Sequence, residues 1–592
     1  MSTLEKELSG KPFEYVPIKV TSGVLLRIGA GIYSSVAGAI KELVSNAFDA
    51  DATRVVISTG YPEFESIQVT DNGTGMSVAD FRKAMASIGT SLKRPLQSAK
   101  WTARYNRPII GMLGIGLMAL TQICDEATIE STQEGEDTKF VAKLDFTQFR
   151  RHISQQRMAA TLEILRDRAP ERPLDESAEI DTETLAMLEL ARMAKERLAE
   201  EGLEDTEGEQ LGYCVVYSNL PAVPEEHGTT ITLTALDPGV VSSLRDEGRA
   251  RDAMPQHILS RGLTWQEFCQ ELRQFSWEEL CERLRLRTSQ LAFNALPQYH
   301  QFLWELAVMT PVEYFDHGPL LVEKDILADK KQELKGYQFS LLVDNQELYK
   351  PVLLPSGEIG KDESPEPEFD YYLEFLKQDE EVDGERLCYH GYIFWQRAQV
   401  EPSALRGLQI HIRNVGIGLY DPTLLKFSII NPSSRAGQMS GEVYIEEGLE
   451  RALNVDRNSF RETDAHYVAL QSHVFEVIGH RGEGIIGKSV DAYYKRKQRA
   501  DQQTAMTHFK ELGALVQQLS NGKLRLEVSN ERSSEPCIII GDRLLLYDEF
   551  PRWPRSSLRR QLAQRLLVAI EAAIAANATP EEIRDLIKNI LF

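Results

Sequence analysis

Three polar residues, Glu42, Asn46 and Asp49, recur at helical spacing in the stretch KELVSNAFDADAT. At about 100° per residue they fall within an arc of roughly 60°, and apolar residues occupy the opposite side of the helix. A solvated helix face more often carries lysine, arginine and glutamate in oppositely charged pairs. A carboxylate followed one turn later by an amide suits a general base beside a ligand for a hard cation. The stripe is therefore either an ordinary solvent-exposed helix face or a row of side chains that bind a cation and activate a reactant.

A second motif, DNGTGM, runs from Asp71 to Met76 directly after an expected strand. Asn-Gly and Thr-Gly pairs favour tight reversals, so a simple turn is one interpretation. A calcium loop is excluded, because the twelfth position from Asp71 is Arg82 and not the required glutamate. The other interpretation is an adenine site. An acid that ends a buried strand can accept a hydrogen bond from an exocyclic amine, and Gly73 and Gly75 would let the backbone approach a flat ring closely.

Two further motifs contain glycine and threonine. In GMLGIGLMAL, Gly111, Gly114 and Gly116 do not have the dinucleotide spacing G-x-G-x-x-G, and no G-K-[ST] follows. This stretch predicts a glycine loop that opens an apolar helix, where backbone amides would bind phosphates or where small residues would allow close packing. The segment HGTTITL places Thr229 at the start of a strand, which alone says little about function.

The four motifs in this order resemble the N, G1, G2 and G3 boxes of the GHKL (Bergerat-fold) ATPases. That superfamily includes DNA gyrase, the heat-shock-protein-90 chaperones, histidine kinases and the MutL mismatch-repair proteins. The resemblance spans roughly residues 24–236, with an insertion rich in charged residues at about 150–210. It implies an N-terminal two-layer α/β sandwich that binds ATP and magnesium.

The resemblance implies a role for each matched residue. Glu42 would orient and activate the attacking water, and Asn46 would bind the magnesium that bridges the phosphates. Asp71 would recognise the adenine amine, and Asp49 would support the site. The other ATP-binding residues would be Gly73, Gly75 and Met76 near the ring, Thr229 beside Asp71, Gly111, Gly114 and Gly116 around the phosphates, and Thr90, Ser91 and Lys93 in a lid over about 77–110.

A weaker resemblance, over residues 336–495, concerns the middle segment of the heat-shock-protein-90 family. There a short L-N-x-x-R motif brings an arginine to the terminal phosphate, and the matching residues are Leu453, Asn454 and Arg457. A guanidinium suits that role, because it stays charged and binds an oxyanion with two hydrogen bonds. The alternative is a helix-capping asparagine followed by a surface arginine.

We expect an α/β (α+β) chain of several domains. The expected parts are an ATPase domain over 1–240, a helical segment over 241–330, a ribosomal-protein-like α/β transducer or middle domain over 331–500, and a small α+β domain over 501–592. The helix expected over 556–577 has an apolar stripe, which would pack either against a partner chain or, as we expect, against its own core. The members of the stripe are Leu558, Leu562, Leu566, Ile570 and Ile574.

The amino-acid composition of the chain limits the kinds of partner that it is expected to bind. The chain has 592 residues, with 66 basic and 89 acidic side chains and a net charge of −23, which disfavours a surface whose main task is to bind nucleic acid. The six cysteines form no C-x-x-C pair, so free thiols are expected. The charged N-terminus and the absence of an apolar run of about 18 residues predict a cytoplasmic protein without membrane contact.

These features favour an ATPase that resembles heat-shock protein 90, with ATP and ADP as ligands. ATP-driven lid closure and homodimerisation would act on an unknown protein client. The alternative is a nucleic-acid clamp of the MutL, MORC or type II topoisomerase kind, which would use the same site. A histidine kinase is disfavoured, because no phosphoacceptor-like helix precedes the first motif, and a nucleotide-binding module without turnover is the fourth possibility.

Overall fold

The computed structural model divides into two units, residues 1–479 and 480–592, each with its own core. It describes residues 8, 10–19, 35–86, 101–111, 116–147, 210–246, 260–286, 291–318, 325–356, 371–427, 436–454, 458–479, 484–554 and 557–591.

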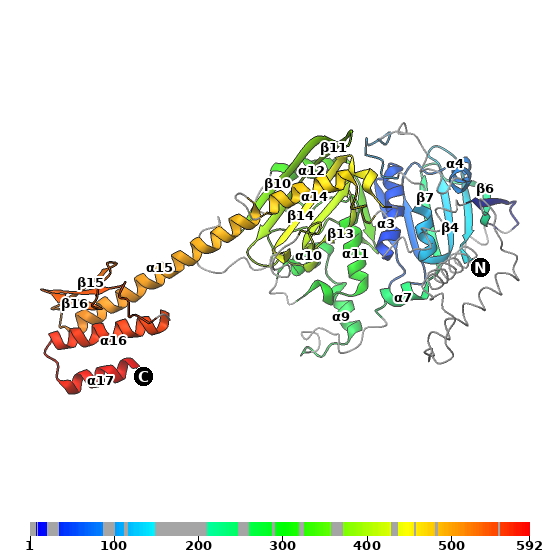
Figure 1. Ribbon diagram of the computed structural model, residues 1–592. Coiled ribbons are helices and arrows are strands. Elements are labelled where there is room, and N and C mark those ends of the chain that lie inside the picture. Colours follow the sequence, from blue (N-terminus) through cyan, green and yellow to red (C-terminus); the bar gives the residue numbers. More distant parts are fainter. Residues whose placement is uncertain are drawn as a thin grey trace, which may run out of the picture. The chain divides into compact units, whose positions relative to one another are not determined.

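A nine-stranded mixed sheet is the frame of the first unit, with the order β1-β6-β5-β4-β7-β3-β2-β8-β9 (Figure 1). Neighbouring strands pair antiparallel except β2 and β8, which are parallel. The strands are β1 (Glu14–Lys19), β2 (Arg54–Ser58), β3 (Ile67–Asp71), β4 (Cys124–Thr132), β5 (Thr138–Asp145), β6 (Gln210–Pro221), β7 (Gly228–Leu236), β8 (Ser340–Val343) and β9 (Gln346–Glu347).

Helix α3 (Val36–Asp49) packs its apolar residues into the core of this unit. It begins at Ser35, whose Oγ accepts a hydrogen bond from the Gly38 amide at 3.2 Å, as expected of an N-cap. Helix α3 contacts β3 of the first sheet. The neighbouring helical elements in this part of the unit are α4 (Val78–Ala86), the 3-10 helix η2 (Gly116–Gln122) and α7 (Pro238–Leu244).

The helical segment lies within the first unit. Two of its helices begin with a capping box: Thr264 and Ser276 each accept a hydrogen bond from the backbone amide three residues on, and the side-chain carboxylate of that residue accepts one from the cap amide. The helices are α9 (Trp265–Leu272), α10 (Trp277–Arg285), α11 (Gln298–Met309) and α12 (Asp325–Gly336).

A five-stranded sheet, β10-β11-β14-β12-β13, also belongs to the first unit. Its strands β12 and β14 are parallel, and the other neighbours are antiparallel. The elements are β10 (Tyr371–Val382), β11 (Glu385–Gln396), β12 (Gly407–Ile412), β13 (Val415–Asp421), β14 (Met439–Glu447) and the following α14 (Ala465–Ile478).

A buried polar network lies in this second sheet. The Glu442 carboxylate on β14 is inaccessible to solvent and accepts hydrogen bonds from the hydroxyls of Tyr392 at 2.7 Å and Tyr314 at 2.9 Å. The Nε2 of His411 on β12 lies 3.0 Å from the same carboxylate. These contacts hold the pKa of Glu442 below its usual value although burial acts in the opposite direction. Tyr314 lies on the chain segment before β8, a strand of the nine-stranded sheet. The network therefore connects the five-stranded sheet to that segment.

The described residues of the second unit form a three-stranded sheet and three helices. Its sheet has the order β15-β17-β16, and the buried core includes Leu512, Leu546 and Val568. Its elements are α15 (Ile485–Leu519), β15 (Arg525–Ser529), β16 (Cys537–Ile540), β17 (Arg543–Tyr547), α16 (Ser557–Ala575) and α17 (Pro580–Leu591).

The expected packing of α16 is wrong. Leu558, Leu562 and Ile574 from the predicted stripe are exposed, and the buried positions of the helix are Gln564, Val568, Ala569, Ala572 and Ala573. The buried face is therefore built mainly from small residues, which let α16 approach its neighbours closely. The spacing of the leucines alone did not predict which face of α16 is buried.

The mixed α/β class is confirmed. The domain boundaries stay a prediction, and two findings bear on them: β8 and β9 extend the first sheet beyond residue 331, and the division between units falls after residue 479. All six cysteines are free. Among the described residues, no helix is both long enough and apolar enough to cross a membrane.

Candidate functional site

Helix α3 presents one polar side chain to the outside. From residue 37 to residue 48 every position is buried except Asn46, and Glu42, one turn earlier, is 2% exposed. An ordinary wet face would expose both side chains. The polar stripe of α3 therefore consists of a buried carboxylate, an exposed amide and, at Asp49, a half-buried carboxylate.

Asp71 ends β3 and pairs in register with Thr229 at the start of β7. Its Oδ1 accepts a hydrogen bond from the Gly73 amide at 2.8 Å. Desolvation raises the pKa of Asp71 to about 6, while the backbone hydrogen bonds from Gly73 and Thr229 act in the opposite direction. The carboxyl is thus an acceptor in a poorly hydrated position, as recognition of an exocyclic amine requires.

The turn after Asp71 is held between α3 and β4. The Thr74 amide donates to the carbonyl of Ala50, the C-cap of α3, at 2.9 Å. Gly75 has φ +67°, and a Cβ built there would lie 1.9 Å from the Thr132 carbonyl oxygen. No larger residue fits this position without moving the backbone.

Asn72 fixes the other side of the same turn. Its Oδ1 accepts from the amides of Thr53 at 2.9 Å and Arg54 at 2.8 Å, and its Nδ2 donates to the Thr53 hydroxyl at 2.8 Å. The side chain therefore bridges the end of β3 to the start of β2.

Ser131 on β4 belongs to this site, and the sequence analysis missed it. Its Oγ lies 3.0 Å from the Thr229 hydroxyl and accepts from the Met76 amide at 2.9 Å. It thereby connects two residues that the sequence assigned to adenine binding. The pairing of β4 with β7 that brings Ser131 opposite Thr229 joins positions far apart in the chain, so local spacing carried no signal for it.

Asp49 holds the start of the glycine loop. Its carboxylate accepts hydrogen bonds from the amides of Ile110 at 2.7 Å and Gly111 at 2.6 Å. A Cβ at Gly111 would lie 2.7 Å from Asp49 Oδ2. Gly116 begins η2. Thr90, Ser91, Lys93, Gly114 and Arg457 lie outside the described residues.

The loop that carries the L-N-x-x-R motif is closed at its base and reaches α3. Leu453 and Phe460 form an antiparallel bridge, and Asn454 binds Ser459 through both backbone and side chain, each at 2.9 Å. Near its tip, Asn458 Oδ1 accepts a hydrogen bond from Lys41 Nζ at 3.3 Å. Lys41 is 1% exposed and directly precedes Glu42.

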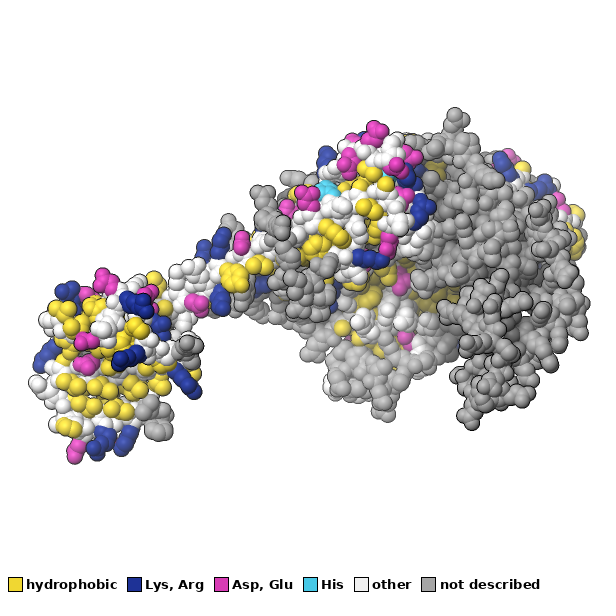
Figure 2. Space-filling view, in the orientation of Figure 1, with side chains coloured by type: hydrophobic (Ala, Val, Ile, Leu, Met, Phe, Trp, Pro, Cys, Tyr) yellow, Lys and Arg dark blue, Asp and Glu magenta, His cyan; other side chains and the backbone are white. Residues whose placement is uncertain are grey.

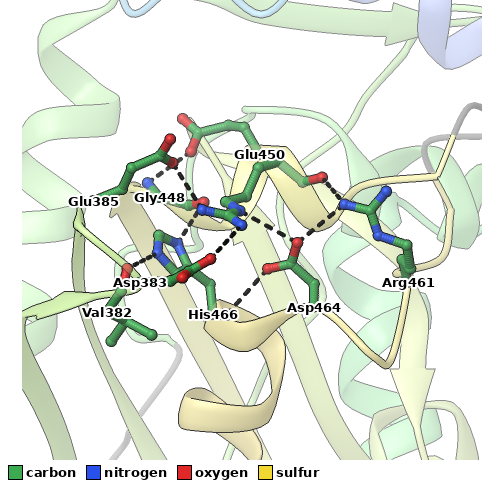
Figure 3. Close-up of polar contacts among 9 residues, drawn as sticks. Val382, Asp383, Glu385, Gly448, Glu450, Arg461, Asp464 and His466 are labelled. Carbon is green, nitrogen blue, oxygen red and sulfur yellow. Dashed lines mark hydrogen bonds and ion pairs between the residues drawn. The ribbon is translucent and has the colours of Figure 1, made fainter.

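An ion-pair network anchors this loop to the five-stranded sheet (Figure 3). Arg451 forms ion pairs with Asp383 at 3.1 Å, Glu385 at 3.1 Å and Asp464 at 3.3 Å. The two ring nitrogens of His466 lie 2.8 Å from the Gly448 carbonyl oxygen and 3.0 Å from that of Val382. The turn between β10 and β11, the loop and the N-terminus of α14 are thus fixed together.

A second contact joins the same sheet to the glycine loop. Arg413, in the turn between β12 and β13, donates a hydrogen bond to the Ile109 carbonyl and lies 3.5 Å from Glu450. Ile109 precedes the two amides that bind Asp49. Two contacts, Lys41 with Asn458 and Arg413 with Ile109, therefore join the α3 and glycine-loop side of the candidate site to loops of the five-stranded sheet.

The donor set around α3 fits a magnesium ion that is held mainly by phosphates. Within the described ranges, no three His, Cys, Asp or Glu side chains converge as a metal site. The exposed amide of Asn46 can supply one oxygen, and Mg²⁺ in nucleotide sites commonly takes one or two protein ligands together with phosphate oxygens and water.

Comparison with known proteins agrees with this geometry. Residues 33–170 match the family described as histidine kinase-, DNA gyrase B-, and HSP90-like ATPase. The DNA mismatch repair protein MutL of Rippkaea orientalis is 36% identical over 126 residues, which is 21% of this chain and 21% of that protein. MutL of Prosthecochloris aestuarii is 31% identical over 130 residues, 22% of this chain and 20% of its own.

A putative type II restriction enzyme, HgiDII of Herpetosiphon aurantiacus, is 33% identical over 117 residues, or 20% of this chain and 18% of the enzyme. The chain thus spans about a fifth of the length of these relatives. The superfamily prediction is confirmed. By their printed names these relatives act in DNA repair or restriction, so they favour the clamp alternative over the chaperone-like function that the sequence analysis put first.

Proposed function

We propose, from the match of residues 33–170 to the histidine kinase-, DNA gyrase B-, and HSP90-like ATPase family, that the chain is a magnesium-dependent ATPase that works as a nucleotide-driven clamp on duplex DNA. Homodimerisation on ATP binding and a cytoplasmic location are parts of the same proposal. The observation that carries the ATPase part is α3, in which Asn46 is exposed one turn after a buried Glu42. The DNA part is supported by the printed names of the relatives.

The proposed chemistry assigns separate tasks to the side chains of the chain. Asp71 accepts a hydrogen bond from the adenine amine, and the Gly73–Gly75 turn leaves room for the ring. Glu42 accepts a hydrogen bond from the attacking water and orients it toward the terminal phosphate. Asn46 provides an oxygen ligand to magnesium, which when bound neutralises charge on the phosphates. Arg457 supplies positive charge at the terminal phosphate.

The test of the ATPase part is Glu42→Ala. We expect it to bind ATP like the parental chain and to hydrolyse it about 10² to 10⁴ times more slowly, the usual contribution of a general base. Steady-state phosphate release and titration calorimetry with ATP measure the two properties separately. Glu65→Ala, at an exposed acid, is the matched control. Hydrolysis at the parental rate in Glu42→Ala would remove Glu42 from the mechanism.

A second candidate is a switch that acts on a protein client, as in the chaperone-like branch. The net charge of −23 favours it, because an acidic surface repels DNA. Duplex DNA separates the two candidates. A clamp should bind DNA with an affinity that falls steeply with salt and should change its ATPase rate in response, whereas a protein-client switch should do neither.

A further inference from the structure

Charge is distributed unequally between the two units. Residues 480–592 contain 18 lysines and arginines against 14 aspartates and glutamates, whereas residues 1–479 contain 48 against 75. The second unit is therefore slightly basic within a strongly acidic chain. A surface that binds phosphate groups is more plausible there than on the first unit.

The basic residues of the second unit include a row on α15. At 100° per residue, Lys488, Lys495, Arg499 and Lys510 fall within an arc of about 60°, and the nearest acid between Gly484 and Gly513, Asp491, lies about 40° beyond its edge. With a rise of about 1.5 Å per residue, the row is about 33 Å long. That length is close to one helical turn of B-DNA.

Part of this helix is uncovered on all sides. Residues 497–504, more than two helical turns, are exposed without interruption. A helix that packs on a core shows alternating burial, as α15 itself does near Leu512 and Val516. Figure 2 shows lysine and arginine side chains along the exposed length of α15.

Two lysines of the row, Lys495 and Lys510, are exposed and available to a partner. Within the described part of the chain no carboxylate forms an ion pair with Lys495, and the same holds for Lys510. An exposed helix that is polar on all sides is usually stabilised by ion pairs between oppositely charged residues at i and i+4. Because these pairs are missing at the two lysines, a solvated connecting helix explains the row less well than a surface that meets phosphates does.

We infer that this stripe of α15, defined by Lys488, Lys495, Arg499 and Lys510, contacts the phosphate backbone of duplex DNA. Lysine and arginine side chains on one helical side can neutralise several phosphates without reading base sequence. The inference rests on the proposed clamp function and adds to it the element that binds the duplex.

The test uses the full chain and a fluorescein-labelled duplex longer than about 20 base pairs, two turns of DNA. The stripe variant is Lys495→Ala, Arg499→Ala and Lys510→Ala, which keeps a good helix former at each position. The matched control is Lys523→Ala, Arg532→Ala and Lys588→Ala, which removes the same charge from exposed positions of the same unit. Fluorescence anisotropy is measured at several salt concentrations.

We expect the stripe variant to bind at least about tenfold more weakly near 0.1 M salt, and its salt slope to fall by about 2 to 3, close to one phosphate per charge removed. The control should change the slope by less than about 1. ATP hydrolysis without DNA should stay at the parental rate in both variants.

The experiment separates a wrong stripe assignment from a wrong clamp function. If the parental chain binds DNA and both variants lose the same affinity, the stripe assignment is wrong and the clamp function stands. If the parental chain binds no duplex at low salt, the clamp function falls and the stripe assignment with it. Loss of basal ATPase activity in the stripe variant alone would show that these residues support the fold.

Discussion

Individual residues of the candidate site stabilise the local fold or are proposed to recognise the ligand, and Asp71 is assigned both tasks. Its carboxyl is placed where an amine can reach it, and its Oδ1 also holds the Gly73 amide. The chemical identity of such residues was readable from motif order. The supporting contacts of Ser131 and Lys41 were not, because each partner is remote in the chain and is brought close by the fold.

The raised pKa of Asp71 predicts a pH effect on stability. Its pKa is about 6 in the folded chain against 3.8 unfolded, so the folded state keeps a proton that the unfolded state releases. Its contribution to stability is therefore present below about pH 4 and is lost as the pH rises through about 6, a change of roughly 2–3 kcal/mol.

Asp71→Asn cannot titrate, so its stability relative to the parental chain should increase from pH 4.5 to pH 7, about the window between the two pKa values. Thermal melts of both proteins without nucleotide measure this difference. A constant difference across the window would contradict the raised pKa. The same variant should no longer bind ATP.

Lys41 provides a second prediction at this scale. Lys41→Met keeps the length of the side chain but removes the hydrogen bond to Asn458. We expect turnover to fall about fivefold, the equivalent of one hydrogen bond of about 1 kcal/mol, with ATP affinity little changed. Lys41→Arg, which keeps a donor, should recover part of the rate. An unchanged turnover number in Lys41→Met would mean that this contact does not position the loop.

At the scale of elements, helix starts were more predictable than helix faces. The capping boxes at Thr264 and Ser276 match a local pattern, Ser or Thr followed three residues later by Glu, because both partners lie within four residues. The buried side of α16 and the addition of β8 to the first sheet depend on which elements meet, which local sequence does not contain.

The network around Glu442 is expected to hold the five-stranded sheet in place. Glu442→Ala would remove the acceptor that Tyr314 and Tyr392 share and would leave the Tyr392 hydroxyl buried without it, so we expect a loss of about 3 kcal/mol or more in the free energy of unfolding. Urea denaturation followed by tryptophan fluorescence measures it. Glu380→Ala, on an exposed position of β10, should change stability by less than about 0.5 kcal/mol. Equal midpoints for the two variants would show that the network contributes nothing.

At the scale of the whole molecule, two separate cores predict two unfolding transitions. Leu546 is fully buried in the core of the second unit. Leu546→Ala should destabilise that unit by about 2–5 kcal/mol and lower only one transition in differential scanning calorimetry. ATP should raise the other transition. A single transition that shifts as a whole in both experiments would show that the units unfold together.

The hydrogen bonds of Asn72 also bear on the chemical ageing of the protein. Asn-Gly is the dipeptide most prone to deamidation, in which the glycine amide nitrogen attacks the asparagine side chain to form a succinimide. Here the Asn72 side chain is held by three hydrogen bonds to Thr53 and Arg54, and the Gly73 N–H is already directed at Asp71. The folded protein should therefore keep this dipeptide intact during storage, and peptide mapping should find isoaspartate at residue 72 only after unfolding.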